Sequence, residues 1–283
     1  SNQLTQTISI SPRRYLNQKK QVSRFISRFS NQTFLRLNQK NAKENAAVLS
    51  VPFKGSINDS TLISINSSFR STIYFNRSNP IFGLNYSITD NQNKSLLLHG
   101  FDTRRLYSQI ISTRYNIIKS ITVLIKVEQN EKSAFSEIFS SDDYAITSKN
   151  INPKIQFQPN SKFRISLKSE YKDKRNSSLY GDESSIYSST GMEANYSMPK
   201  TGRLNFEFNF IKTSFYDSNS TETSSPLQFE MLEGLQVGKN YTWTARYQQT
   251  FKNNLQANIS YEGRSSPGFK VVHTGTFQIQ LLF

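Results

Sequence analysis

Short turns and long polar connections alternate along this chain, and they separate segments in which apolar and polar residues alternate one by one. Counted back from the C-terminus, every short turn lies at one end of the predicted strands and every long connection lies at the other end. A two-layer β-sandwich has no physical reason to sort its loops by length, whereas strands that cross a membrane have different surroundings on the two sides. The short turns are at residues 78–80, 118–120, 159–161, 199–202 and 252–254, and the long connections are at 90–94, 129–148, 173–184, 217–225 and 264–270.

The stretch from Val271 to Phe283 shows the alternation most clearly and ends on an aromatic residue. Its apolar side chains fall on one side of an extended chain, and its threonines and glutamines fall on the other. Outer-membrane barrels end in a similar strand, whose terminal aromatic residue belongs to the assembly signal. We therefore predict an all-β fold: a transmembrane antiparallel outer-membrane β-barrel of about 12–16 strands. Its C-terminal strand should end at Phe283 and pair with the strand from Leu255 to Gly263. The predicted C-terminal barrel signal is Phe277, Ile279, Leu281 and Phe283.

The polar loop around Pro52 and Gly55 divides the chain. Residues 1–61 are predicted to hold N-terminal strands and a loop, which can continue from an upstream part of the barrel. Residues 62–283 are predicted to hold the regular barrel strands, with short periplasmic turns and long extracellular loops.

Two stretches are ambiguous. Val22, Phe25, Ile26 and Phe29 have helical spacing, with Arg24 and Arg28 opposite, but period-two alternation resumes directly afterwards. We favour a strand here, with a small interfacial or plug helix as the alternative. The stretch from Phe229 to Gly234 is interpreted as the upper part of the next strand, kinked or bulged at Gly234 and Gly238.

Composition agrees with strands that have one apolar face. Hydrophobic residues make up 35% of the chain and aromatic residues 13%, so a few large side chains supply much of the apolar surface. Disordered chains are poor in aromatic residues and show no such alternation. The chain has no cysteine, no apolar run long enough for a transmembrane helix and no signal-peptide pattern at its start.

The formal charge of +15 raises the question of a nucleic-acid partner. The basic residues are scattered and form no nucleic-acid-binding motif, so we expect no nucleic acid. Attraction to the phosphates of lipopolysaccharide is the more economical use of this charge. The expected partners are outer-membrane lipid, lipopolysaccharide and other outer-membrane or periplasmic proteins.

Two sets of residues are predicted to mark the faces of the barrel. Aromatic residues beside the short turns form a candidate membrane-interface girdle, although aromatic residues are also simply good strand formers. Charged residues in the middle of strands should face the lumen, although an exposed sandwich face would also allow them. The girdle candidates are Tyr115, Phe157, Phe163, Tyr196 and Phe251, and the lumen-facing candidates are Lys126, Glu128, Arg164, Lys168, Glu170, Glu207 and Arg246.

Signs of catalysis are weak. His99 beside Asp102, with one of the many serines, is the one hydrolase arrangement worth naming, and serine is so common here that the coincidence is cheap. The acidic pairs Asp142–Asp143 and Asp182–Glu183 are calcium candidates, but such pairs in polar loops are usually just solvated. We predict a protein that is not an enzyme, with no catalytic residue, no metal site and no cofactor.

Four segments of the chain are distinctive: F-R-S-T-I-Y-F-N-R-S-N-P at 69–80, F-E-M-L-E-G-L-Q-V-G-K-N-Y-T-W at 229–243, Y-E-G-R-S-S-P at 261–267 and H-T-G at 273–275. With them the chain resembles a family of large outer-membrane β-barrel proteins of Bacteroidota. The resemblance covers nearly the whole chain and implies a location in the cell outer membrane, but it implies no reaction. Members of the family are longer, with extracytoplasmic domains ahead of the barrel.

The leading functional hypothesis is a non-catalytic integral barrel that acts as a subunit or scaffold of a larger outer-membrane complex, of the barrel-assembly or protein-secretion type. One alternative is a transport barrel or pore for a small or polymeric ligand. Another is a secreted soluble β-sandwich adhesin.

Overall fold

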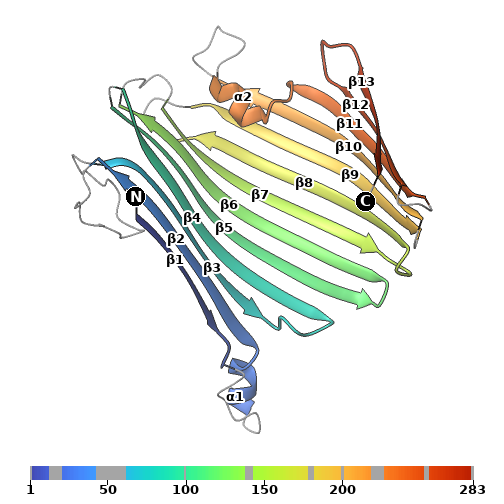
Figure 1. Cartoon of the computed structure of the whole chain (residues 1–283), viewed down its shortest axis with the longest axis horizontal. Helices are drawn as coiled ribbons and strands as arrows, with labels where there is room; N and C mark the ends of the chain where they lie inside the picture. Colours follow the sequence, from blue (N-terminus) through green and yellow to red (C-terminus); the bar gives the residue numbers. More distant parts are fainter. Residues whose placement is uncertain are drawn as a thin grey trace. The chain divides into compact units, whose positions relative to one another are not determined.

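The computed structural model of the chain is almost entirely β-strand (Figure 1). It describes residues 2–12, 21–42, 62–98, 100–137, 143–177, 182–198, 201–217, 226–251 and 255–281. The strands are β1 (Asn2–Ile10), β2 (Phe29–Asn41), β3 (Leu62–Phe75), β4 (Phe82–Leu97), β5 (Gly100–Ile118), β6 (Ile121–Ser136), β7 (Tyr144–Phe157), β8 (Phe163–Asn176), β9 (Ser184–Met198), β10 (Gly202–Tyr216), β11 (Gly238–Thr250), β12 (Leu255–Ser265) and β13 (Val272–Leu281). The helices are α1 (Gln21–Ile26) and α2 (Pro226–Leu232).

All strands belong to one sheet of 13 strands, and each strand pairs with its neighbours in the sequence. The order runs from β1 to β13 without a crossover, and the pairings within β1–β4 and within β9–β13 are all antiparallel. Since the two ends of this order are β1 and β13, the described sheet is not closed. The all-β prediction and the expected strand number are therefore confirmed, and so is the pairing of β13 with β12.

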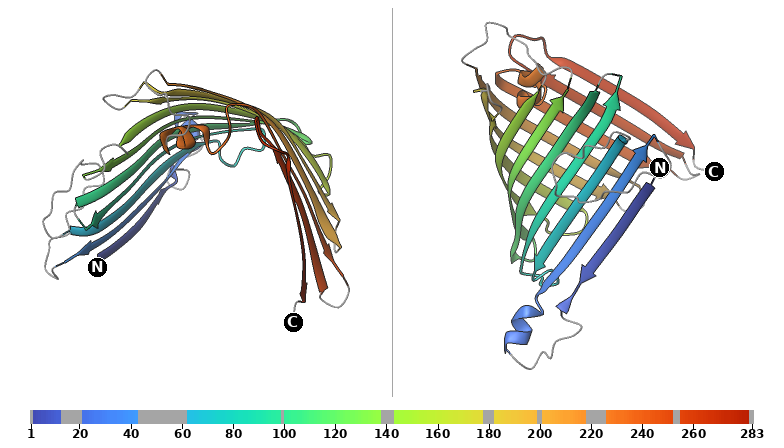
Figure 2. Two further views of the ribbon diagram at one scale, coloured as in Figure 1. Left: turned by 90° about the horizontal axis from the view of Figure 1, so that it is seen from above. Right: turned by 90° about the vertical axis from the view of Figure 1, so that its left-hand side faces the viewer.

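The chain forms two compact units. The first contains residues 1–113, 127–149 and 174–182, and the second contains residues 114–126, 150–173 and 183–283. Within the first unit, α1 lies at the end of β1 and β2 (Figure 2). Within the second unit, α2 contacts β9 and β10 (Figure 2).

Both ambiguous stretches are helical, so the strand predictions there are wrong. α1 is the helical alternative that the spacing of Val22, Phe25 and Ile26 allowed. Directly after α2, Glu233 and Gly234 have φ angles of 56° and 74°, so the chain leaves the helix through two residues in left-handed conformation. The Gly234 amide donates to the Phe229 carbonyl at 3.0 Å, and this bond closes the helix end.

The strands are longer than predicted at the end opposite the short turns. The polar stretch 90–94 lies inside β4, and most of 129–148 belongs to β6 and β7. The polar character of these residues predicts loop, but residues 90–95 pair with β3 in unbroken register, and β6 and β7 belong to the same sheet. The sorting of connections by length therefore has two exceptions. The connection from Leu97 of β4 to Gly100 of β5 is short, although it lies at the end opposite the short turns. The connection between β1 and β2, residues 11–28, is long, although it lies at the short-turn end.

A conventional core is small in the described part of the chain. One apolar cluster joins Leu37, Leu62 and Ile65, with Phe101 packed against it. Among the described residues, more polar than apolar side chains are buried, and many large apolar side chains are exposed. The single-sheet fold thus presents apolar groups outward instead of enclosing them.

Candidate functional site: the two faces of the sheet

The strand registers of the second unit sort its side chains onto two chemically different faces. Directly paired residues share a face, and the pairs Phe206–Ala245, Ala245–Tyr261 and Ile259–Phe277 carry the apolar face from β10 to β13. We call this side the apolar face and the opposite side the polar face. The apolar face of β9 to β13 contains Met192, Ala194, Tyr196, Leu204, Phe206, Phe208, Phe210, Tyr241, Trp243, Ala245, Tyr247, Leu255, Ala257, Ile259, Tyr261, Phe277, Ile279 and Leu281.

The apolar face has a boundary along each strand. In β10 it starts at the short-turn end and continues to Phe210, whose ring lies 5.2 Å from that of Tyr241 on β11. The next residues on the same face of these strands are charged, namely Lys212 and Lys239, which lie directly opposite each other in the β10–β11 register. From Gly202 to Phe210 the strand has about the 9–11 residues that a tilted strand needs to cross the hydrocarbon core of a bilayer.

The same boundary recurs in the first unit. On β4, Tyr86 and Ile88 are followed on the same face by Asp90, which accepts hydrogen bonds from Arg105 at 2.8 and 3.0 Å. The hydrogen bonds to Asp90 raise the pKa of the Arg105 guanidinium above its ordinary value. On both β4 and β10, the apolar face carries apolar residues near the short turns and charged residues farther along the strand. This is the pattern expected for strands that extend past a membrane boundary.

The predicted girdle residues all lie near the short-turn ends of their strands. Phe157 ends β7, Phe163 begins β8 and Phe251 directly follows β11. Tyr115, Phe157, Tyr196 and Phe251 are exposed and Phe163 is partly exposed. Their position fits a membrane-interface girdle, which stays a prediction.

The predicted C-terminal signal lies on β13. Phe277, Ile279 and Leu281 are 63%, 57% and 49% exposed, and all point to the apolar face. Phe283 lies outside the described residues. The exposure of a row of large apolar side chains is costly in water, because apolar area is stabilised by removal from water.

An aromatic group at the far boundary of the apolar face was not predicted. The Trp243 indole covers Gly263 of β12 so closely that a Cβ there would overlap its ring. Beyond Gly263 it approaches His273, at 5.7 Å between ring centres. His273 stacks on Tyr261 and its Nδ1 lies 2.8 Å from the Tyr261 hydroxyl. The signal in the sequence was an isolated glycine inside a strand, which often marks close approach of a neighbouring group.

The predicted lumen-facing charges of the second unit lie on its polar face. Lys168 forms an ion pair with Glu207, and Arg246 pairs with Glu262 at 2.7 Å. Glu170 accepts a hydrogen bond from Asn150 at 2.9 Å and pairs with Lys172 at 3.3 Å. Arg164 lies on β8 and Lys126 on β6, both in the second unit. Glu128, also on β6, belongs to the first unit and accepts a hydrogen bond from Ser108 at 3.4 Å.

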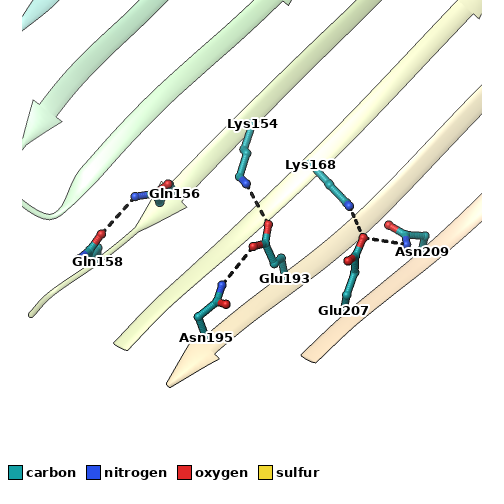
Figure 3. A network of polar contacts seen from close by, with 8 residues as sticks. All are labelled: Lys154, Gln156, Gln158, Lys168, Glu193, Asn195, Glu207 and Asn209. Atoms are coloured by element: carbon teal, nitrogen blue, oxygen red, sulfur yellow. Dashed lines mark hydrogen bonds and ion pairs between the residues drawn. The ribbon is translucent and has the colours of Figure 1, made fainter. Parts of the chain in front are cut away.

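Two lysines on the polar face each cross a complete strand to reach their carboxylate (Figure 3). Lys154 of β7 donates to Glu193 of β9 at 2.9 Å, and Lys168 of β8 donates to Glu207 of β10. Asn195 and Asn209 donate to the same carboxylates, each at 3.1 Å. The carboxylates are thus held from two sides, and the lysines link alternate strands.

Gly191 makes one of these crossings possible. It lies on β9, between Lys168 and Glu207, and pairs with Asn209. A Cβ at this position would overlap the Asn209 side-chain oxygen and would lie 2.9 Å from the Phe208 carbonyl oxygen and 3.0 Å from Lys168 Cε. A larger residue here would therefore push the lysine side chain away from the sheet.

The segment from α2 to Gly238 folds back onto the polar face at the end opposite the short turns. Ser185 donates to the Met231 carbonyl at 3.2 Å, and Thr213 and Asn240 donate to the Gln236 carbonyl at 2.6 and 2.7 Å. Met231 and Asn240 are each only 1% exposed. Lys172 adds an ion pair to Glu233 at 3.0 Å, so the segment is fixed by buried hydrogen bonds together with one charge contact.

The candidate chemical sites are not assembled in the part of the chain that the structure describes. His99 and Asp142 lie outside the described residues, while Asp102 pairs with Arg104 at 3.3 Å and Asp143 accepts the Ser136 amide at 2.7 Å. Among described residues, no group of His, Cys, Asp and Glu could hold a metal ion.

Neither of the described helices has the length and apolarity that a bilayer crossing requires. No family model and no curated protein matches this chain.

Proposed function

We propose that this protein is a non-catalytic integral β-barrel of the bacterial outer membrane that acts as a subunit or scaffold of a larger complex. One observation carries the proposal: the sheet has an exposed apolar face that begins near the short turns and gives way to charged residues about nine residues later. Lipid is the surrounding that stabilises such a face, and water on the other side suits the polar face.

The edges of the sheet support the subunit role. A strand in lipid cannot leave its backbone amides and carbonyls without partners, so an inserted sheet needs a partner strand at each edge. β1 and β13 are the edges of the described order. A barrel closes its own edges, whereas a complex can also supply a strand from another protein.

The proposed orientation places the short turns in the periplasm and the long connections outside the cell. Cationic residues such as Lys212 and Lys239 then lie just beyond the outer boundary of the apolar face, where lipopolysaccharide phosphates are expected. Complexes for barrel assembly or protein secretion are the proposed assemblies.

The membrane proposal is tested by expression in a Gram-negative host. We expect the protein in the outer-membrane fraction, soluble only with detergent, and migrating differently on gels before and after boiling. Protein that stays soluble without detergent would overturn the proposal and favour the β-sandwich adhesin. The single described sheet argues against that alternative, since a sandwich needs a second sheet to cover the apolar face.

The subunit role has its own test, which is purification from native membranes under mild detergent. Stoichiometric recovery of the same outer-membrane or periplasmic proteins would support it. A chain that purifies alone, with no partner even after cross-linking in intact cells, would contradict it.

A transport barrel is the second candidate, and the charge of the polar face favours it. Three arginines are exposed on this face and form no ion pair among the described residues: Arg164, Arg203 and Arg264. The nearby carboxylates Glu193, Glu207 and Glu262 already form ion pairs with other residues. Rings of Arg and Lys select anions in pores. A steady conductance in planar bilayers, with a reversal potential showing anion preference, would support transport, and a sealed bilayer would support the scaffold.

A further inference from the structure

An aromatic cluster joins α1 to the short-turn end of the sheet in the first unit. Phe25 of α1 contacts Phe29 of β2 and Phe75 of β3, with ring centres 5.5 and 6.0 Å apart. Phe29 and Phe75 are directly paired, 5.0 Å apart, and Phe75 also approaches Phe82. The cluster therefore continues the face of β3 that carries the exposed Ile73 onto the helix.

α1 leaves its own apolar side chains uncovered. Val22, Phe25 and Ile26 are 71%, 54% and 42% exposed. A helix that plugged a lumen would bury these residues against the polar face, whereas here Phe25 packs on the aromatic end of the apolar one. The interfacial alternative considered for this stretch is therefore the one that the contacts favour.

A polar recess of about 560 Å³ lies beside the helix, on the same end of the sheet. It is lined by Arg24 and Arg28 of the helix segment and by Arg77 of the β3–β4 turn, together with serine and asparagine side chains. The described lining residues include no Asp or Glu. The recess is thus a cationic pocket with hydroxyl and amide donors, adjacent to an aromatic group.

We propose that α1, the aromatic cluster and this recess form a binding site for an anionic phospholipid at the periplasmic surface of the membrane. Arginine matches a phosphate group in geometry and charge, and short basic amphipathic helices bury their apolar side chains at the headgroup boundary. The phosphate takes the recess, and the acyl chains lie against Phe25, Val22 and Ile26. This inference rests on the proposed membrane insertion.

A free phosphate ion would use only half of this arrangement. It would bind the arginines but would leave the exposed phenylalanine, valine and isoleucine side chains in water. A phospholipid uses both parts, because its headgroup and its acyl chains are covalently joined. The site is therefore assigned to lipid.

The test uses the full chain refolded in non-ionic detergent micelles that contain phospholipid brominated on its acyl chains, which quenches nearby tryptophan. Trp243 is the natural reporter, since it is the single tryptophan and lies on the apolar face. A Phe25→Trp variant in a Trp243→Phe background carries its one tryptophan on α1 and reports on the helix. We expect brominated phosphatidylglycerol to quench this introduced tryptophan several-fold more effectively than brominated phosphatidylcholine does.

A charge-matched pair of variants identifies the arginines. Arg24→Gln with Arg28→Gln should abolish the preference for phosphatidylglycerol, while Lys119→Gln with Lys162→Gln, at other short turns, should leave it intact. Millimolar inorganic phosphate should not relieve the quenching.

The failures are distinguishable. If no brominated lipid quenches native Trp243, the membrane proposal itself is wrong. If Trp243 is quenched but the tryptophan introduced on α1 is not, or if the two lipids quench the introduced tryptophan equally, the lipid site is refuted while the barrel stands. Displacement of the lipid by inorganic phosphate would likewise overturn the assignment to phospholipid.

Discussion

Replacing Phe277 with lysine tests whether the apolar face of β13 meets lipid. The residue is 63% exposed, so contacts among the described residues cover only the smaller part of its side chain. Its neighbour Thr276 is also exposed, lies at the same height and points to the polar face. Thr276→Lys is therefore a matched control that adds the same charge on the other side of the same strand.

The size of the effect follows from the depth of the residue. Phe277 lies about 14 Å along the strand from Leu281 at roughly 3.4 Å per residue, which is about 10 Å of depth at a tilt near 45°. That is close to the middle of an apolar band about 25 Å tall, where a lysine on the lipid face costs about 2–4 kcal/mol. In water, an exposed substitution of this kind changes stability by about 0.5 kcal/mol or less.

The assay is urea unfolding of protein inserted in phospholipid vesicles, followed by the fluorescence of Trp243. Phe277→Lys should lower the free energy of unfolding by about 2–4 kcal/mol relative to Thr276→Lys. Equal unfolding midpoints for the two variants would refute the lipid-facing assignment. Phe277→Ser, which adds no charge, provides a milder variant if the lysine variant does not insert.

Three further substitutions test individual contacts. Gly263→Val should displace the Trp243 ring, lower the free energy of unfolding by about 1–3 kcal/mol and shift the tryptophan fluorescence. Gly275→Val is the control, because no atom lies within 4 Å of the added Cβ, and it should be neutral. Equal effects of the two variants would contradict the close packing of Trp243 on Gly263. Asn240→Ala should lower the free energy of unfolding by about 1–3 kcal/mol and speed amide hydrogen exchange in residues 229–237. Unchanged exchange would show that the hydrogen bond from Asn240 to Gln236 does not fix this segment. Lys168→Met should cost about 1 kcal/mol or less, since the ion pair is partly exposed, and a loss several times larger in urea unfolding would show that this contact is essential.

The strands could be predicted because their signal is local. Alternation of apolar and polar residues needs no knowledge of the partner strand, so the segments around Phe163 and Phe206 were assigned correctly. The ends of these strands opposite the short turns were missed because polar residues in a strand resemble a loop. The helices were harder to predict for another reason: α1, which the sequence left as the alternative to a strand, is only six residues long, and α2 is fixed by tertiary contacts of Met231.

The contacts between strands could not be predicted from the sequence in the same way. Lys168 and Glu207 were identified as separate charges on the same face, but their pairing depends on registers across two strands. The role of Gly191 follows only when both registers are known. Single-sequence patterns specify the face of a residue, and the register specifies its neighbours.

The lysine crossings have a mechanical consequence for the sheet. The smallest slip that keeps each residue on its face is two residues, which moves a strand by about 7 Å. Such a slip of β9 would carry Glu193 away from Lys154 of β7 and replace Gly191 beneath the Lys168 side chain with a residue that has a Cβ. Because each lysine crosses the strand next to it, sliding any one of β7 to β10 disturbs at least one ion pair. The strands β7 to β10 are therefore expected to resist sliding along one another and to move as one rigid unit.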